Sequence, residues 1–179
     1  MKLLYALTGP PRSGKTTAVI KIKELLESAK VKVDGMFTEE IKVSGDRLGF
    51  TVTRIATGEK GIMAHVDIKS IHRIGRYGVD MKVLEEVGVR GIIEGIDNSE
   101  FLIIDEVGPM ELLSDKFIVA VKRVLSHQVP TVVTVHYRAS HPLVHEVKRS
   151  AGGRLITVTE HNRDKIPYKI VEEVLGILR

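Results

Sequence analysis

Residues 3–22 read LLYALTGPPRSGKTTAVIKI, and the hydrophobic pattern of this stretch changes at a turn that contains glycine and proline. Residues 2–8 form a short apolar run that stops at Gly9, which predicts a buried strand. From Thr17 onward the apolar residues recur at helical spacing, with charged residues on the opposite face. The stretch therefore predicts a strand, a tight turn and a helix in succession.

The turn itself follows the spacing G-x-x-x-x-G-K-[ST], which is the pattern of a phosphate-binding P-loop. Its glycines allow successive N–H groups to point at phosphate oxygens, and the amino end of the helix adds partial positive charge. Lys15 can reach the β- and γ-phosphates, and Thr16 can offer its hydroxyl to Mg²⁺. The candidate nucleotide-binding residues are Gly9, Pro10, Pro11, Arg12, Ser13, Gly14, Lys15, Thr16 and Thr17.

The alternative is a glycine-rich turn between strand and helix that binds nothing. A chance match to the pattern in a chain of this size is on the order of one in a hundred or less, which disfavours that alternative. The motif does not decide the roles of two residues inside it. Arg12 could contact phosphate or face water, and Thr17 suits a helix position better than a ligand position.

Composition limits the class of protein. The 179 residues, 43% of them hydrophobic and 4% aromatic, predict one domain, 1–179, with an aliphatic core. A net charge of +4 without a Lys/Arg block argues against a nucleic-acid surface. The chain has no cysteine, which excludes disulfides, Cys-ligated zinc and thiol nucleophiles. Because we find no signal peptide or long apolar span, we expect a cytoplasmic protein without a membrane partner; the pattern does not define an oligomeric state.

Few thermolabile amides and many charged residues suit a thermophile: the amide residues are Asn98, Gln128 and Asn162.

The rest of the chain alternates predicted strands and helices. We expect strands at 33–40, 101–108, 131–136 and 155–159, and helices at 81–96, 142–149, 167–178 and after a capping Ser114. Turn signals within 41–65 predict an antiparallel β-hairpin excursion, and 73–80 reads as a loop. This alternation indicates an α/β fold in three layers, with a mostly parallel sheet and helices on both faces.

A second candidate element ends the apolar run 101–104. Asp105 stands at the carboxyl end of this predicted strand, where open α/β sheets bind ligands, and Glu106 follows it directly. Together with Thr16, Asp105 is a candidate Mg²⁺ ligand, and Glu106 is a candidate to orient or deprotonate an attacking water. The alternative is that the two acids only solvate the strand end.

Other polar residues have weaker signals. His136 follows the strand at 131–135 and could sense a γ-phosphate or bond the attacking water, or it could simply be a polar strand end. Zinc binding by His136, His141 and His145 has little support, because Pro142 interrupts them and neither Glu nor Cys joins them.

Charged residues near the predicted strand ends leave further alternatives. Arg73, Arg76 and Arg138 are candidates for a charge-stabilising finger, although exposed structural arginines are common. Glu39 and Glu40 could order water or substrate, or be solvated. Asn162 or Arg163, in the Asn-Arg-Asp run after the last strand, could stack on a base or hydrogen-bond to it loosely, or the run could be an ordinary turn.

Several motifs occur together and in one order along the chain: TGPPRSGKTT, GMFTEEI, RIGRYGVD, IIDEVGPMEL, TVVTVH and VTEHNRD. In these the chain resembles the cancer-related nucleoside-triphosphatase family of small P-loop proteins. The resemblance implies a RecA-like sheet in which the strand at 131–135 lies between the strand before the P-loop and the strand ending in Asp105. It also implies slow Mg²⁺-dependent hydrolysis of ATP, GTP and other nucleoside triphosphates to the diphosphate and phosphate.

The resemblance has one departure, since Pro109 stands where many relatives have Lys. If that Lys contacts phosphate or a neighbouring subunit, we expect slower turnover or a substitute Arg. The sequence alone leaves two other functions open: a nucleotide or small-molecule kinase, and a nucleotide-dependent switch or binding module. The first is disfavoured by the excursion, whose only arginines are Arg47 and Arg54.

Overall fold

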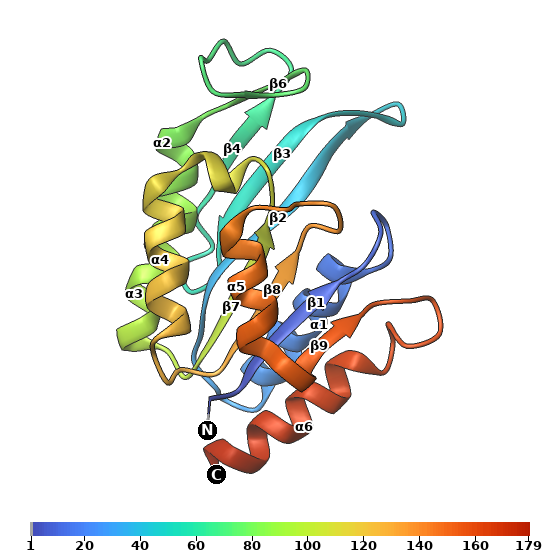
Figure 1. The fold of residues 1–179 in the computed structure, drawn as a ribbon, viewed down its shortest axis with the longest axis vertical. Helices are drawn as coiled ribbons and strands as arrows, with labels where there is room; N and C mark the ends of the chain where they lie inside the picture. The colour runs from blue at the N-terminus through green and yellow to red at the C-terminus, as the bar shows by residue number, and fades with distance from the viewer. Residues whose placement is uncertain (1) are drawn as a thin grey trace.

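The computed structural model describes residues 2–179, whose strands form one mixed sheet with helices on both faces (Figure 1). Across the described residues the strand order is β5-β6-β4-β3-β2-β7-β8-β1-β9. The parallel part consists of β1 (Leu4–Thr8), β2 (Val33–Val43), β7 (Phe101–Val107), β8 (Thr131–Val135) and β9 (Leu155–Thr157). Since β8 lies between β1 and β7, the strand order implied by the resemblance is confirmed.

The antiparallel part extends the sheet beyond β2. It contains β3 (Asp46–Arg54), β4 (Lys60–His65), β5 (Arg73–Ile74) and β6 (Tyr77–Val79). The predicted excursion is present, but the prediction of a loop at 73–80 is wrong, because β5 and β6 form a short hairpin there. Gly75, at φ 56°, begins the two-residue turn between them. The strands are too short to show an alternating pattern in the sequence.

The helices form two layers. One face is covered by α1 (Lys15–Ser28) and α6 (Ile166–Leu178), and the other by α3 (Arg90–Asn98), α4 (Asp115–Leu125) and α5 (Pro142–Ala151). The region predicted as a helix at 81–96 is continuous from α2 (Met81–Val83) through a π-helical turn, 84–89, into α3. Within residues 2–179, no helix is both long and apolar enough to cross a bilayer.

Side-chain caps that are visible in the sequence mark the beginning of α4 and α5. Ser114, as predicted, caps α4 by accepting a hydrogen bond from the Phe117 N–H at 3.1 Å. His141 caps α5 in the same way through Nδ1, at 3.0 Å from the Leu143 nitrogen. The two cores between sheet and helices are mainly aliphatic, with Phe101 and Phe117 among their largest buried side chains.

A buried ion pair joins the antiparallel strands to the core. Arg54, at the end of β3, contacts Asp34 Oδ2 on β2 at 2.9 Å and Glu94 on α3 at 2.7 Å. Asp34 also accepts a hydrogen bond from the Gly35 N–H at 2.8 Å. Because Arg54 and Asp34 are both almost fully buried, this pair fixes the position at which the extension meets the parallel sheet.

Gly35 is the point of closest approach between β2 and β7. Its φ is 114°, and a Cβ added there would lie 1.9 Å from the Ile103 carbonyl oxygen. The residue pairs with Ile103 in the parallel ladder, three residues before Thr38 reaches the carboxyl end of the sheet. A side chain at this position would therefore separate the two strands.

We expect Gly35→Ala to reduce the free energy of unfolding by about 3 kcal/mol or more, through backbone strain and overpacking. Gly153→Ala is the matched control, since no atom lies within 4 Å of a Cβ built there. Its effect should stay within about 0.5 kcal/mol. Urea unfolding of both variants checks this, and equal losses of stability would contradict the role assigned to Gly35.

Candidate functional site

The predicted P-loop connects β1 to α1 in a compact curl. Gly9, Arg12 and Gly14 have φ values of 151°, 65° and 105°, and the Ser13 N–H donates to the Pro10 carbonyl at 3.1 Å. A Cβ at Gly9 would lie 2.8 Å from Ser13 Oγ, so only glycine fits there. The loop ends at the amino end of α1, which favours a bound anion.

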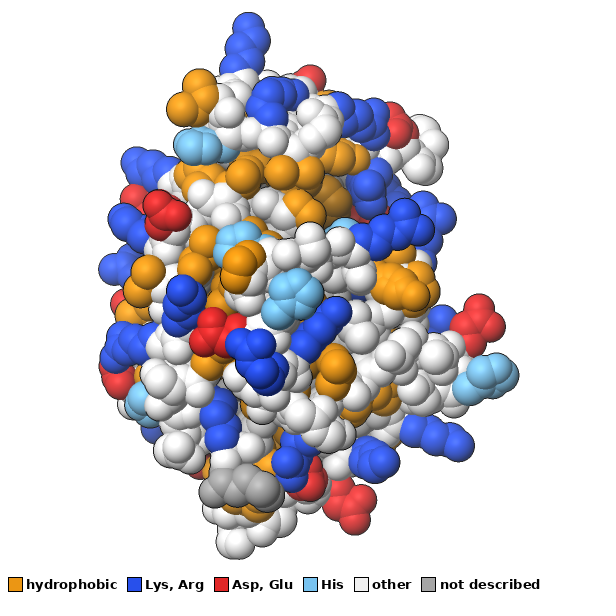
Figure 2. Space-filling view, in the orientation of Figure 1, with side chains coloured by type: hydrophobic (Ala, Val, Ile, Leu, Met, Phe, Trp, Pro, Cys, Tyr) orange, Lys and Arg blue, Asp and Glu red, His pale blue; other side chains and the backbone are white. Residues whose placement is uncertain are grey.

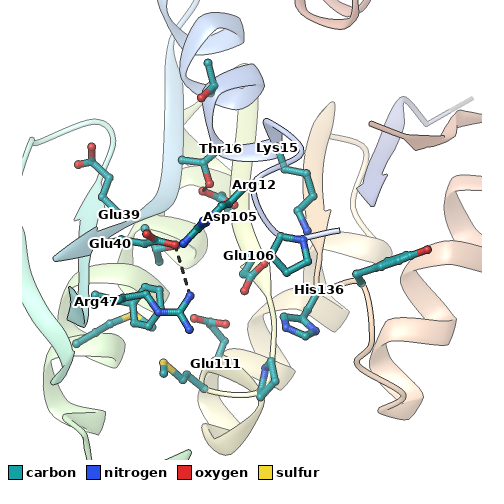
Figure 3. Close-up of a pocket in the computed structure, with 18 of the residues that line it drawn as sticks. Arg12, Lys15, Thr16, Glu39, Glu40, Arg47, Asp105, Glu106, Glu111 and His136 are labelled. Carbon is teal, nitrogen blue, oxygen red and sulfur yellow. Dashed lines mark hydrogen bonds and ion pairs between the residues drawn. The ribbon is translucent and has the colours of Figure 1, made fainter. Parts of the chain in front are cut away.

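Lys15 lies across this loop. Its ammonium donates to the Gly9 carbonyl at 2.8 Å, and its side chain lies between the loop and the acids at the carboxyl end of β7 (Figure 3). Burial lowers the pKa of Lys15 from its usual value, while the charges of Glu106 and Asp105 oppose this change. The ammonium is therefore held at the loop by one carbonyl that a phosphate oxygen can replace.

Asp105 links three elements of the fold. Its side chain is almost fully buried at the end of β7 and accepts hydrogen bonds from Thr16 Oγ1 on α1 at 3.0 Å and from Thr134 Oγ1 on β8 at 2.5 Å. Burial raises the pKa of Asp105 to about 6, although the hydrogen bonds favour its charged form. The neighbouring charge of Glu106 raises the pKa of Asp105 further.

The Thr16 hydroxyl and the Asp105 carboxylate are hard oxygen ligands, which suit Mg²⁺. Among the described residues no group of three or more His, Asp or Glu side chains could form a metal site from protein ligands alone. Mg²⁺ in nucleotide enzymes usually has one or two protein ligands, with water and substrate phosphates completing its coordination. Two converging oxygen ligands beside a P-loop therefore fit this ion.

Two glutamates follow Asp105. A Cβ built at Gly108 would lie 2.8 Å from Glu106 Oε1 and 3.0 Å from Glu111 Oε1, so both carboxyl groups converge on this glycine. Burial raises the pKa of Glu106, opposed by the charge of Lys15. Burial and then the charge of Glu106 raise the pKa of Glu111 well above its usual value. Glu111 was missed by the sequence analysis, although a buried acid in the apolar run PMELL was a signal.

His136 follows β8 and faces the same space as the acids (Figure 3). Its backbone N–H donates to the Val107 carbonyl at 3.1 Å, and its ring Nδ1 accepts a hydrogen bond from the backbone N–H of Arg138 at 3.2 Å. Burial lowers the pKa of His136, helped by the charges of Lys15 and Arg138. At neutral pH the ring is thus neutral with its proton on Nε2, where it can donate a hydrogen bond.

These side chains line a cavity of about 800 Å³. Of the residues predicted for the site, those that line this cavity are Pro11, Arg12, Gly14, Lys15, Thr16, Thr17, Asp105, Glu106 and His136. Gly9, Pro10 and Ser13 lie outside the lining and shape the loop instead. Glu39, Glu40 and Pro109 also line the cavity.

Asn162 is engaged within its own loop. Its amide Nδ2 donates to the Thr157 carbonyl at 2.9 Å, and its Oδ1 accepts from the Thr159 N–H at 2.7 Å. The neighbouring Arg163 lines the cavity and covers the P-loop, since a Cβ at Gly14 would lie 3.1 Å from Arg163 Cδ. Arg163, rather than Asn162, is therefore the side chain of this loop that lines the cavity.

The three predicted arginine-finger candidates do not line the cavity. Arg73 is held by the Ile68 and Arg76 carbonyl oxygens, at 3.1 and 2.8 Å, and Arg76 pairs with Asp46 at 3.0 Å. Arg138 is exposed. The arginines that do line the cavity are Arg12, which lies in the P-loop itself, and Arg47 and Arg163, which come from distant segments of the chain.

The chain matches the sequence pattern of a family described as NTPase over residues 4–171. The chain belongs to this NTPase family. The nucleoside-triphosphatase THEP1 of Thermofilum pendens is 39% identical over 97% of this chain and 96% of its own length, and that of Thermotoga maritima is 35% identical over 100% and 96%.

Two solved structures of NTPase-family relatives share the fold. The crystal structure of THEP1 from the hyperthermophile Aquifex aeolicus has a TM-score of 0.82 at 32% identity, covering 96% of this chain and 99% of that one. The solution structure of a human cancer-related nucleoside triphosphatase has a TM-score of 0.79 at 32% identity, covering 97% and 98%. The resemblance found in the sequence motifs is therefore confirmed.

Burial of Asp105 predicts a pH dependence of stability. Since its pKa rises from 3.8 to about 6 on folding, the folded state binds more protons between these values, and stability falls as pH rises from about 4 to about 6. The difference corresponds to about 3 kcal/mol. We expect Asp105→Asn to remove this loss, so that its stability relative to the parent chain improves by about 2–3 kcal/mol between pH 4 and pH 7.

Urea unfolding in EDTA without nucleotide measures this effect. Asp115→Asn, at an exposed aspartate, is the control and should keep the pH dependence of the parent chain. If the difference in the free energy of unfolding between the parent chain and Asp105→Asn stayed constant across this pH range, burial would not destabilise the ionised form of Asp105.

Proposed function

We propose that this chain is a Mg²⁺-dependent nucleoside-triphosphatase that hydrolyses several nucleoside triphosphates slowly. The observation that carries the proposal is the contact of 3.0 Å between Thr16 Oγ1 and Asp105 Oδ2 at the mouth of the P-loop. It joins a candidate anion site to an acidic strand end within one cavity. Membership of the NTPase family and the names of the THEP1 relatives support the same activity.

The side chains have distinct roles in this proposal. The P-loop N–H groups and Lys15 bind the phosphates, and Lys15 exchanges the Gly9 carbonyl for phosphate oxygen. Thr16 and Asp105 would hold Mg²⁺, which when bound neutralises phosphate charge. Asp105 is itself oriented by Thr134. Positioning and charge neutralisation then supply most of the catalysis, as in other phosphoryl-transfer enzymes.

Glu106 is the residue placed to act on water. Its carboxylate lies next to Lys15 and one residue beyond Asp105, at the end of β7. Burial raises the pKa of Glu106, which makes it a stronger base in its ionised form. His136 can hold the same water, or a γ-phosphate oxygen, through Nε2.

Two features support broad base choice and slow turnover. The aliphatic part of Arg163 packs against Gly14 of the loop and the residue lines the cavity, where a guanidinium can stack on any base without reading its edge. Among the cavity arginines, Arg47 is engaged by Tyr77 at 3.0 Å, and Arg12 is exposed. An arginine held against the γ-phosphate is worth about 10³–10⁵ in rate in GTPases, so its lack would slow the reaction.

We expect Glu106→Gln to lower the rate of phosphate release by about 10²–10⁴-fold, because it removes a base without removing a phosphate contact. Calorimetry with a non-hydrolysable ATP analogue and Mg²⁺ should show affinity within about threefold of the parent chain. Glu24→Gln, at an exposed position on α1, should leave both unchanged. Hydrolysis of ATP, GTP, CTP and UTP at parental rates in Glu106→Gln would remove Glu106 from this role.

Arg163→Ala should raise the KM for each of the four nucleotides by about tenfold while kcat changes little, because its contact does not involve the reacting atoms. Arg149→Ala, an exposed change on α5, serves as the control. Steady-state kinetics with all four nucleotides check this. A change confined to one base would instead indicate edge-specific recognition by Arg163.

A further inference from the structure

The cavity extends well beyond the P-loop. Ligand pockets commonly measure about 300–1,000 Å³, and this one, at about 800 Å³, lies in the upper part of that range. Its far part, here called the distal compartment, is lined by Phe50, Met63, Ile74, Tyr77 and Met110. Four of these come from the antiparallel strands, which take no part in building the P-loop. Figure 2 shows hydrophobic side chains gathered over the region of β4 and β6.

The aromatic wall of the distal compartment is held in place before any ligand binds. The rings of Phe50 and Tyr77 meet edge to face, with centroids 5.6 Å apart. The Arg47 guanidinium lies 5.3 Å from the Phe50 ring centre, and its Nε donates to the Tyr77 hydroxyl at 3.0 Å. Fixed rings and methionines beside a guanidinium suit a planar heteroaromatic molecule with hydrogen-bonding atoms at its edge.

The strand order places this compartment on the γ-phosphate side of a bound nucleotide. Arg163 covers the P-loop from the side of β9, whereas the compartment lies over β3, β4 and β6, on the other side of β1. In Figure 3, Glu106 lies between Lys15 on one side and Glu111 and Arg47 on the other. The acid proposed to activate water therefore faces both parts of the cavity.

We propose that the distal compartment binds a hydroxyl-bearing heteroaromatic molecule, which accepts the γ-phosphoryl group in place of water. This rests on the proposed function, since the donor nucleotide uses the same P-loop. The acceptor oxygen bonds to the γ-phosphorus, and the bond from this phosphorus to the β–γ bridging oxygen breaks. The nucleoside diphosphate leaves, and the acceptor's hydroxyl proton passes to Glu106 and then to solvent.

Slow hydrolysis follows from this arrangement. Without the acceptor, only water reaches the γ-phosphate; Glu106 and His136 can hold it, but Phe50, Met63 and Ile74 of the distal compartment offer it no side-chain hydrogen bond that would help to fix its direction of attack. With the acceptor bound, its body excludes water and its hydroxyl group lies beside Glu106. The antiparallel strands would then serve as the acceptor-binding part of a phosphotransferase.

Binding is tested by saturation-transfer NMR with four common nucleosides, pyridoxine and a hydroxymethylpyrimidine as probes. Each is measured with the chain saturated by Mg²⁺ and a non-hydrolysable ATP analogue, so that the P-loop site is filled. We expect at least one probe to bind under these conditions. Ile74→Arg, which fills the compartment, should weaken that binding at least tenfold, and Phe50→Ala should weaken it as well.

Ile71→Arg is the matched control, because Ile71 is 94% exposed on the same segment, outside the cavity lining, and should leave probe binding unchanged. Incubation of a bound probe with Mg²⁺·ATP should then yield phosphorylated probe, with the ADP formed equal to the sum of phosphorylated probe and inorganic phosphate by ³¹P NMR.

Three results would overturn the proposal: no probe binds the saturated chain, binding persists in Ile74→Arg, or a bound probe is never phosphorylated. Failure of the proposed function is distinguishable, because the ATP analogue itself would then not bind.

Discussion

The site depends on the hydrogen bonds that the buried carboxylate of Asp105 accepts. It accepts hydrogen bonds from Thr16 at the start of α1 and from Thr134 on β8, while it stands itself on β7. The P-loop and the acidic strand end are thereby held at one position relative to each other before any ion or nucleotide arrives. Burial of this group opposes its charge, so part of the folding free energy is spent on keeping the site assembled.

The central sheet and the curled loop between β1 and α1 were predictable because their signals are local. Gly9, Gly14, Lys15 and Thr16 lie within eight residues, and Asp105 follows a short apolar run whose length and composition favour a buried strand. The order of the central strands was implied by the resemblance to a known family. Every one of these elements can be recognised without knowledge of which distant residues meet.

The parts that sequence reasoning missed depend on contacts between distant segments. Thr134 reads as one more β-branched residue in TVVTV, and only the fold shows that its hydroxyl reaches Asp105. Arg47 and Arg76 are equally plausible cavity residues until the β5–β6 hairpin engages Arg76 with Asp46. The sequence offers Asn162 and Arg163 alike as base contacts, and only the fold shows that the Asn162 amide is hydrogen-bonded within its own turn. Short-range patterns contain no information about such competition for hydrogen bonds.

Arg54 has a consequence for motion. It anchors the root of the antiparallel strands through Asp34 and Glu94, whereas the ion pair between their outer turns, Arg76 with Asp46, is exposed. Exposed pairs contribute little, and buried ones are costly to break. Because the base is held by a buried ion pair and the outer turns by an exposed one, thermal displacement should increase from the base toward the outer turns of the antiparallel strands.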